Sequence, residues 1–121
     1  MTSSVMNAHT HKATEAQALQ RFSALSQETR LRIVRLLVIA GDEGLPAGTI
    51  ASQLGSSDSR LSFHLSHLEH AGLVQSRREG RSIIYSVVFP ALAALSEFLI
   101  HDCCRGFKEN DHAGCQPESC V

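Results

Sequence analysis

The sequence predicts a mostly helical domain that carries one β-hairpin, and three observations support this fold class. Apolar residues recur at helical spacing along most of the chain between residues 14 and 99. Two short helical segments, Leu45–Leu54 and the stretch 56–72, are separated by Gly55, as in a helix-turn-helix. Two β-rich runs follow on either side of Glu79-Gly80 and predict a hairpin. A hairpin directly after a helix-turn-helix is a wing, so we predict a winged helix-turn-helix.

Two helices are predicted before this motif. The first spans Thr14–Ser26, with Thr14 as its N-cap, and its apolar stripe consists of Ala18, Leu19, Phe22 and Leu25. The second spans Gln27–Ala40, stops at Gly41 and is apolar on most sides, which predicts a central position. Its arginines, Arg30, Arg32 and Arg35, are expected on a solvated face, although Arg30 could also contact phosphate.

The second helix of the motif is the predicted recognition helix, which would enter the major groove of DNA. Serines open it as a cap, Gly72 closes it, and Leu61, Leu65 and Leu68 form its apolar stripe. Hydrogen-bonding side chains lie between these leucines, and we predict contacts to bases or nearby phosphates from Ser57, Ser59, Arg60, Ser62 and His64. Arg60 could bind guanine in bidentate fashion. His64 could instead be a buried histidine with its hydrogen bonds satisfied.

The hairpin spans residues 73–88, and basic residues crowd its tip. We predict that Arg77, Arg78 and Arg81 contact the phosphate backbone or the minor groove. The alternative is an edge hairpin that charge keeps soluble.

The last predicted helix starts at Pro90, and its apolar stripe consists of Phe89, Leu92, Leu95, Phe98 and Leu99. A winged fold of 121 residues has few places to bury this stripe, and the first helix has a similar one. We therefore predict a two-fold dimer through the first and last helices. The alternative is that both stripes serve only the core of one chain.

Length and composition indicate one domain, divided here into a disordered tail (1–12), a DNA-binding and dimerisation domain (13–105) and a cysteine-containing tail (106–121). The formal net charge is −1, which excludes a protein that coats DNA non-specifically, so basic groups must act locally. No signal peptide and no membrane-spanning run is recognisable, so we expect a cytoplasmic protein without a membrane partner. Nucleophile motifs, phosphate-binding loops and paired carboxylates are lacking, so we expect no enzyme.

All four cysteines, Cys103, Cys104, Cys115 and Cys120, lie near the carboxyl end. This clustering indicates metal binding or redox sensing rather than a disulfide framework. Adjacent residues on a helix diverge by about 100°, so Cys103 and Cys104 could bind one ion only where the helix frays, and Arg105-Gly106 makes such an end plausible. Cys115 or Cys120 would supply a third sulfur.

Several motifs, in order, resemble the ArsR/SmtB family. Residues 22–33 (FSALSQETRLRI) are similar to its "LADPTRLRIL" opening, and residues 61–65 (LSFHL) to its "S-x-H-L" recognition helix. Residues 68–74 (LEHAGLV), and residues 78–81 (REGR) followed by Ile84-Tyr85, are similar to the end of that helix and to the wing. The resemblance covers about residues 18–99.

The resemblance implies a homodimeric repressor that leaves a double-stranded DNA operator when a metal or metalloid ion binds. The arsenic-responsive branch often carries C-x-C before the recognition helix, but the matching segment, Leu45–Ile50, has no cysteine. The aspartate and histidine ligands of the zinc-sensing branch are also missing from the last helix, apart from His101-Asp102 at its end.

We therefore expect As(III) or Sb(III) to be the inducer, bound as a soft ion by the C-terminal thiolates. A thiol redox switch is one alternative. Another is Cd(II), Pb(II) or Zn(II) held by four sulfurs with His101 or His112 nearby. A third is a winged-helix module that ignores ligands.

Overall fold

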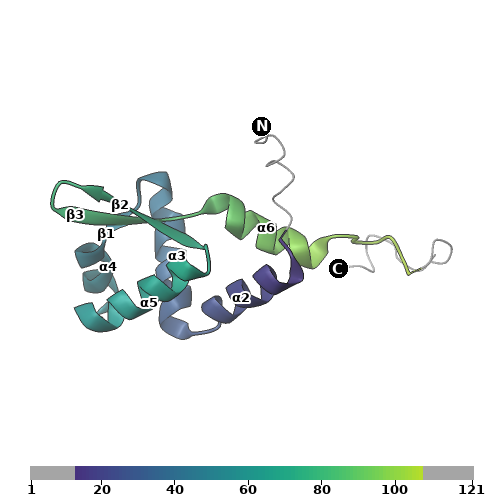
Figure 1. The fold of residues 1–121 in the computed structure, drawn as a ribbon, viewed down its shortest axis with the longest axis horizontal. Helices are drawn as coiled ribbons and strands as arrows, with labels where there is room; N and C mark the ends of the chain where they lie inside the picture. Colours follow the sequence, from purple (N-terminus) through teal and green to yellow (C-terminus); the bar gives the residue numbers. More distant parts are fainter. Residues whose placement is uncertain (1–12, 108–121) are drawn as a thin grey trace.

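The computed structural model describes residues 13–107, which form a helical domain with a small sheet at one end (Figure 1). Within these residues no helix is long and apolar enough to cross a membrane. The predicted tail 1–12 and residues 108–121, with Cys115 and Cys120, lie outside the described residues. The elements follow the order α2 (Glu15–Leu25), α3 (Glu28–Ala40), η1 (Gly41–Glu43), β1 (Leu45–Pro46), α4 (Ala47–Leu54), α5 (Asp58–His70), β2 (Val74–Glu79), β3 (Ser82–Val87) and α6 (Phe89–Ile100).

The predicted fold class, a helix-turn-helix followed by a wing, is confirmed. Helices α4 and α5 form the helix-turn-helix, and Gly55 ends α4 in a left-handed conformation. The strands form an antiparallel sheet in the order β1-β3-β2, and the pair Glu79↔Ser82 closes the wing. The tight turn occupies Gly80 and Arg81, one position later than the predicted Glu79-Gly80.

Side-chain caps fix the starts of the helices. Thr14 caps α2 in a reciprocal capping box with Gln17, and Gln27 caps α3 by accepting a hydrogen bond from the backbone of Arg30. Ser57 caps α5 in the same way, through the backbone N–H of Arg60. The predicted ends of these helices are therefore correct to within a residue or two.

The core lies where α3, α4, α5 and the wing meet. Its fully buried large side chains are Ile33, Leu37, Ile50, Leu61, Leu65, Leu68, Leu73 and Val74. The three leucines of α5 thus face inward as predicted, and the opposite side of that helix is left to solvent. Helices α2 and α6 pack side by side, away from the wing (Figure 1).

One predicted boundary is wrong, at the start of the helix-turn-helix. The sequence pattern places Leu45 and Pro46 in the first helix of the motif, but they form β1 and pair with Tyr85 and Ile84 of β3. Proline lacks the N–H that a helix or a central strand needs, whereas an edge strand tolerates it. Helix α4 therefore begins at Ala47, with extended Pro46 as its N-cap.

Gly44 lets β1 approach the wing closely. Its φ of 70° and ψ of −167° belong to a region that essentially only glycine occupies. A Cβ at this position would overlap the carbonyl oxygen of Tyr85 in β3. Gly41 has nearly the same backbone angles, φ 78° and ψ −159°, but open space where a Cβ would be.

Alanine substitutions at these two glycines distinguish the cost of backbone strain from the cost of steric overlap. Gly41→Ala should lower the free energy of unfolding by about 1–3 kcal/mol through strain alone. Gly44→Ala should cost a further ~1–3 kcal/mol, because the β1–β3 pair must move apart. Urea denaturation of both variants measures the difference. Equal losses would show that the close approach of Gly44 to Tyr85 contributes nothing.

Candidate nucleic-acid interface and C-terminal thiols

The exposed side of α5 carries most of the predicted DNA contacts. Ser59, Arg60 and Ser62 are exposed on this helix, opposite its buried leucines. Ser57 is also exposed, but its oxygen accepts the hydrogen bond from the Arg60 N–H at 3.3 Å, so it serves as the helix cap. Its hydroxyl proton and its second lone pair remain available to another group.

His64 belongs to the core rather than to the exposed side of α5. Only 7% of its surface is exposed, and its Nδ1 lies 3.2 Å from Nη1 of Arg30. Guanidinium only donates hydrogen bonds, so His64 Nδ1 must accept and therefore carries no proton. Burial, followed by the charge of Arg30, lowers the pKa of His64 below its usual 6.5. His64 is therefore the buried histidine of the alternative interpretation, and it does not belong to the predicted contact surface.

Arg30 also departs from its predicted place on a solvated face. It is buried, and its Nε donates a hydrogen bond of 2.7 Å to the carbonyl of Ala24, near the end of α2. Its charge thus lies at the negative end of the α2 dipole. Arg32 and Arg35 are exposed as predicted, and Arg32 pairs with Glu28 across one helical turn.

A second arginine connects α2 to the C-terminal end of α5. Arg21 Nε donates a hydrogen bond of 2.9 Å to the carbonyl of Ala71, the C-cap of α5. Gly72 follows with a φ of 80°, which turns the chain toward β2. The recognition helix is therefore connected to α2 at its middle, through Arg30 and His64, and at its C-terminal end, through Arg21.

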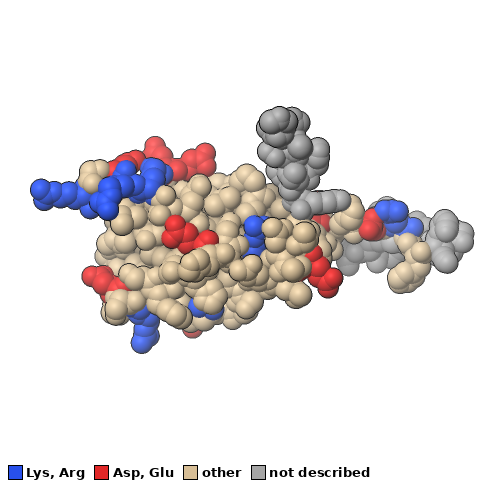
Figure 2. Space-filling model, viewed as in Figure 1, with Lys and Arg blue, Asp and Glu red and all other residues tan. Residues whose placement is uncertain are grey.

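The wing displays its arginines at the tip, where blue side chains project from one end of the molecule (Figure 2). Arg78 and Arg81 are exposed, and their side chains make no hydrogen bond or ion pair within residues 13–107. Arg77 differs, because its Nε lies 2.9 Å from Glu79 and its Nη2 donates a 2.9 Å hydrogen bond to the Glu43 carbonyl. It fastens the wing to η1, so it is less available for DNA than Arg78 and Arg81.

The sequence interpretation missed one exposed residue on α5. Phe63 leaves 63% of its surface exposed, although the other apolar side chains of this helix are buried. The sequence held a signal, because Phe63 lies outside the leucine stripe, among serines and histidines.

The chain leaves helical geometry just before the two described cysteines. Helix α6 ends at Ile100, and Asp102 and Cys104 have φ angles of 70° and 63°. The Sγ atoms of Cys103 and Cys104 consequently lie 3.2 Å apart. Cys103 is an exposed free thiol, whereas Cys104 is disulfide-bonded.

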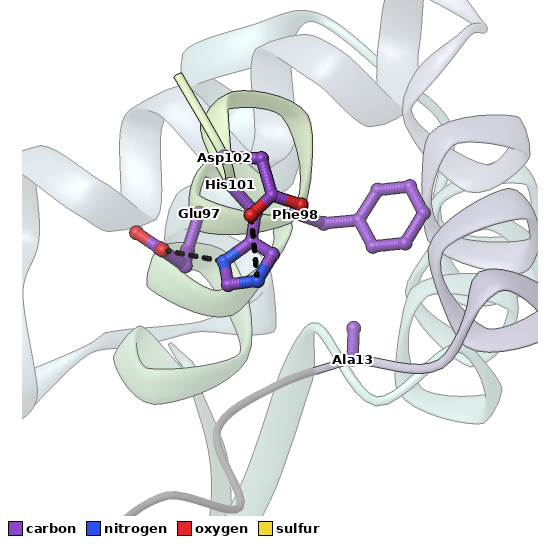
Figure 3. A pocket seen from close by; sticks show the side chains of 5 residues that line it. All are labelled: Ala13, Glu97, Phe98, His101 and Asp102. Carbon is purple, nitrogen blue, oxygen red and sulfur yellow. Dashed lines mark ion pairs between the residues drawn. The ribbon is translucent and has the colours of Figure 1, made fainter. Parts of the chain in front are cut away.

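Three polar side chains surround a pocket beside these cysteines (Figure 3). Nδ1 of His101 lies 3.6 Å from Glu97, and its Nε2 lies 3.7 Å from Asp102, while Phe98 and Ala13 complete the lining. Asp102 also pairs with Arg105. Across the described part of the chain, no three histidine, cysteine, aspartate or glutamate side chains are arranged to hold a metal ion. His101 therefore has carboxylate neighbours but no ligand set of its own.

Comparisons with known proteins agree with this architecture. Residues 25–77 match a family described as a helix-turn-helix domain. The chain is 33% identical to the transcriptional activator HlyU of Vibrio cholerae over 94 residues, which cover 78% of this chain and 84% of that protein. It is 48% identical to a putative arsenical resistance operon repressor, ArsR, of Halobacterium salinarum over 59 residues, which cover 49% of this chain and 45% of that protein.

A solved structure also matches. It is a homodimeric winged helix-turn-helix DNA-binding domain from Mycobacterium bovis, described as a possible ArsR-family transcriptional regulator. The TM-score is 0.58 at 25% identity, and the match covers 80% of this chain and 87% of that one.

The hydrogen bond between Arg30 and His64 predicts a pH-dependent stability. A folded-state pKa below 6.5 means that the unfolded chain takes up a proton first as pH falls. The contribution is therefore present above about pH 6.5 and is lost below it, with a slope of at most about 1.4 kcal/mol per pH unit. Urea denaturation between pH 7.5 and 5.5 measures this slope.

His64→Asn, which retains an acceptor, should flatten this slope. His70→Asn, exposed on the same helix, is the matched control and should keep the parent's slope. An unchanged slope in His64→Asn would refute the assignment.

Proposed function

Because the chain belongs to the ArsR/SmtB family of helix-turn-helix transcriptional regulators, which are not enzymes, we propose that it is a homodimeric repressor released from its operator by As(III) or Sb(III). The inducer would bind the C-terminal thiolates. The observation that carries the proposal is the convergence of Cys103 and Cys104 at the end of α6, in a protein built to bind DNA.

Two surfaces support contact with duplex DNA. Ser59, Arg60 and Ser62 stand on the exposed side of α5, which would lie in the major groove. Arg78 and Arg81 stand at the tip of the wing, where they would neutralise phosphates. A net charge of −1 leaves such local groups to supply the electrostatic attraction.

Apolar surface on α2 and α6 supports a dimer. Leu19 of α2 is 62% exposed, and Leu99 of α6 is 66% exposed. The two helices are neighbours, so these side chains would form one apolar interface with a second copy of the chain. The homodimeric relative from Mycobacterium bovis has the same architecture.

The geometry at the end of α6 suits a thiophilic ion. Metal–sulfur bonds of about 2.3 Å place two sulfurs on one ion less than about 4 Å apart. The two Sγ atoms are already 3.2 Å apart. Soft thiolates select soft ions, and a third sulfur would come from Cys115 or Cys120. Cys104 must be reduced before it can act as a ligand. One similar protein is a putative arsenical resistance operon repressor.

A thiol redox switch is the second candidate, and the disulfide bond of Cys104 favours it. In such a switch two thiols lose two protons and two electrons to an oxidant such as hydrogen peroxide, which becomes water. The same α6 end would then respond to oxidation instead of to an ion.

The wing gives a prediction about salt. Removal of one arginine that neutralises a phosphate should reduce the slope of log K against log [salt] by about 0.9. In a homodimer each substitution removes two such arginines, so Arg78→Ala and Arg81→Ala should each reduce the slope by about 1.8 in filter-binding or anisotropy titrations with duplex DNA. Arg77→Ala is the matched control and should change the slope less, because Arg77 is held by Glu79 and Glu43. If neither Arg78→Ala nor Arg81→Ala reduces the slope, the wing assignment fails.

The thiols give the test of the function. A duplex selected from a random library is bound by the reduced protein and titrated with arsenite and antimonite under thiol-free reductant. Binding should weaken by about 5–150-fold, the usual range of coupling between two sites. The double variant Cys103→Ser/Cys104→Ser should bind the duplex as the parent does and should not respond.

Further arms separate the alternatives. His101→Gln is the control for a site with nitrogen ligands, and it should keep the arsenite response. The responses of the parent and of this variant to Cd(II) and Zn(II) are measured for comparison. Release by peroxide alone, with no effect of arsenite, would replace the metalloid proposal with the redox switch. A response to arsenite that survives the double variant would refute the thiol site.

A further inference from the structure

Phe63 is an unusual residue to find on the outer side of the recognition helix. Leu61, Leu65 and Leu68 of α5 are buried, so the core does not need Phe63, which remains 63% exposed. Exposure of a phenyl ring to water is unfavourable and is relieved when an apolar partner covers it. The question is which partner lies opposite this side of α5.

The position of Phe63 points to DNA bases. Ser59 and Ser66 precede and follow it by four and three residues, so the three side chains share one side of the helix. Phe63 lies one helical turn after Ser59, in the N-terminal half of α5, and its ring lies beside His67 and borders a pocket with Gln20 of α2. In a recognition helix this N-terminal part lies against the base edges.

The ring of Phe63 is also held in place. Its centroid lies 5.3 Å from that of His64 at an interplanar angle of 66°, and 6.3 Å from that of His67 at 85°. Both are edge-to-face arrangements, which aromatic rings favour. His64 is itself fixed by Arg30. A preorganised ring loses little conformational freedom when it binds.

We infer that Phe63 contacts the C5-methyl group of a thymine in the operator and contributes sequence specificity there. The inference rests on the proposed function, the binding of duplex DNA. The thymine methyl is the apolar group that base pairs present in the major groove, and phenylalanine is among the side chains that contact it. Serine hydroxyls bond to several bases, so they discriminate weakly. Selectivity would then come from Arg60, for guanine, and from Phe63, for thymine.

Removing the methyl group from the DNA tests this directly. The parent protein selects a duplex from a random library, and each thymine of that duplex is replaced in turn by deoxyuridine, which lacks only the C5-methyl. At one position in each half-site the affinity should fall about fourfold, the effect of one buried methyl group. Phe63→Ala removes the contact from both half-sites of the dimer, so it should bind the unsubstituted duplex about 16-fold more weakly. It should lose nothing further when deoxyuridine occupies that position.

Two control variants sharpen the result. Phe63→Leu keeps an apolar contact and should retain part of the deoxyuridine effect. Ile39→Ala removes an apolar side chain that is 80% exposed at the end of α3, and it should bind all duplexes as the parent does. Thermal unfolding followed by circular dichroism confirms that each variant is folded.

The outcomes separate the two proposals. Selection of no duplex would contradict the proposed function itself. Selection of a duplex that tolerates deoxyuridine at every position would overturn only the inference about Phe63. A deoxyuridine effect of the same size in Phe63→Ala would overturn it as well, because another side chain would then contact the methyl group.

Discussion

The position of the recognition helix depends on the buried guanidinium of Arg30. Its Nε bonds to the carbonyl of Ala24 at the end of α2, and its Nη1 bonds to His64 in the middle of α5. Hydrogen bonds that involve a charged group contribute about 1.5–3 kcal/mol each, and leaving such a group buried without them costs more. Arg30 therefore fixes three helices relative to one another, since it belongs to α3 itself. Arg21 adds a second connection, from α2 to the end of α5.

These two connections have a consequence for regulation. Helix α2 packs against α6, and its exposed Leu19 lies in the proposed dimer interface. A shift of α2 would thus be transmitted to the middle and to the C-terminal end of α5. The spacing of two recognition helices in a dimer would then follow the packing of α2 and α6. The wing, which carries proposed DNA contacts, and the end of α6, which Cys103 and Cys104 follow, lie toward opposite ends of the molecule (Figure 1).

Much of this fold could be predicted from the sequence because its determinants are local. Thr14, Gln27 and Ser57 cap helices that begin immediately after them, and the wing needs only two β-rich runs and a turn that contains glycine. Other features depend on neighbours distant in the sequence. The arginine pattern of α3 resembles a solvated face, but Arg30 is buried because Ala24 and His64 supply acceptors. Leu45–Pro46 forms a strand because β3 lies beside it, which no local pattern indicates.

The candidate site likewise combines features that the local sequence predicts with features that depend on distant neighbours. Exposure of Ser59, Arg60 and Ser62 follows from helical periodicity, which the leucines of α5 reveal. The difference between Arg77 and its neighbours Arg78 and Arg81 does not follow from periodicity. It arises because Arg77 bonds to the Glu43 carbonyl, which η1 contributes. The approach of Cys103 to Cys104 depends on positive φ angles that a non-glycine residue seldom adopts, so periodicity alone predicts divergence.

The location of the thiols limits how an inducer can act. Cys103 and Cys104 follow the last residue of α6, and this end of α6 lies away from the wing (Figure 1), so a bound ion would lie away from the proposed DNA contacts of the wing. A ligand shifts an equilibrium only by its difference in affinity between two states. An ion that releases the operator, as proposed, would therefore bind more tightly when α6 and α2 pack in the arrangement that does not fit the operator. The turn 101–104 can supply that difference, because its sulfurs converge only while the chain keeps its non-helical geometry beyond Ile100. Any repacking of α6 that restores helix through residue 103 would separate the sulfurs and weaken the site, and by reciprocity a bound ion would oppose that repacking.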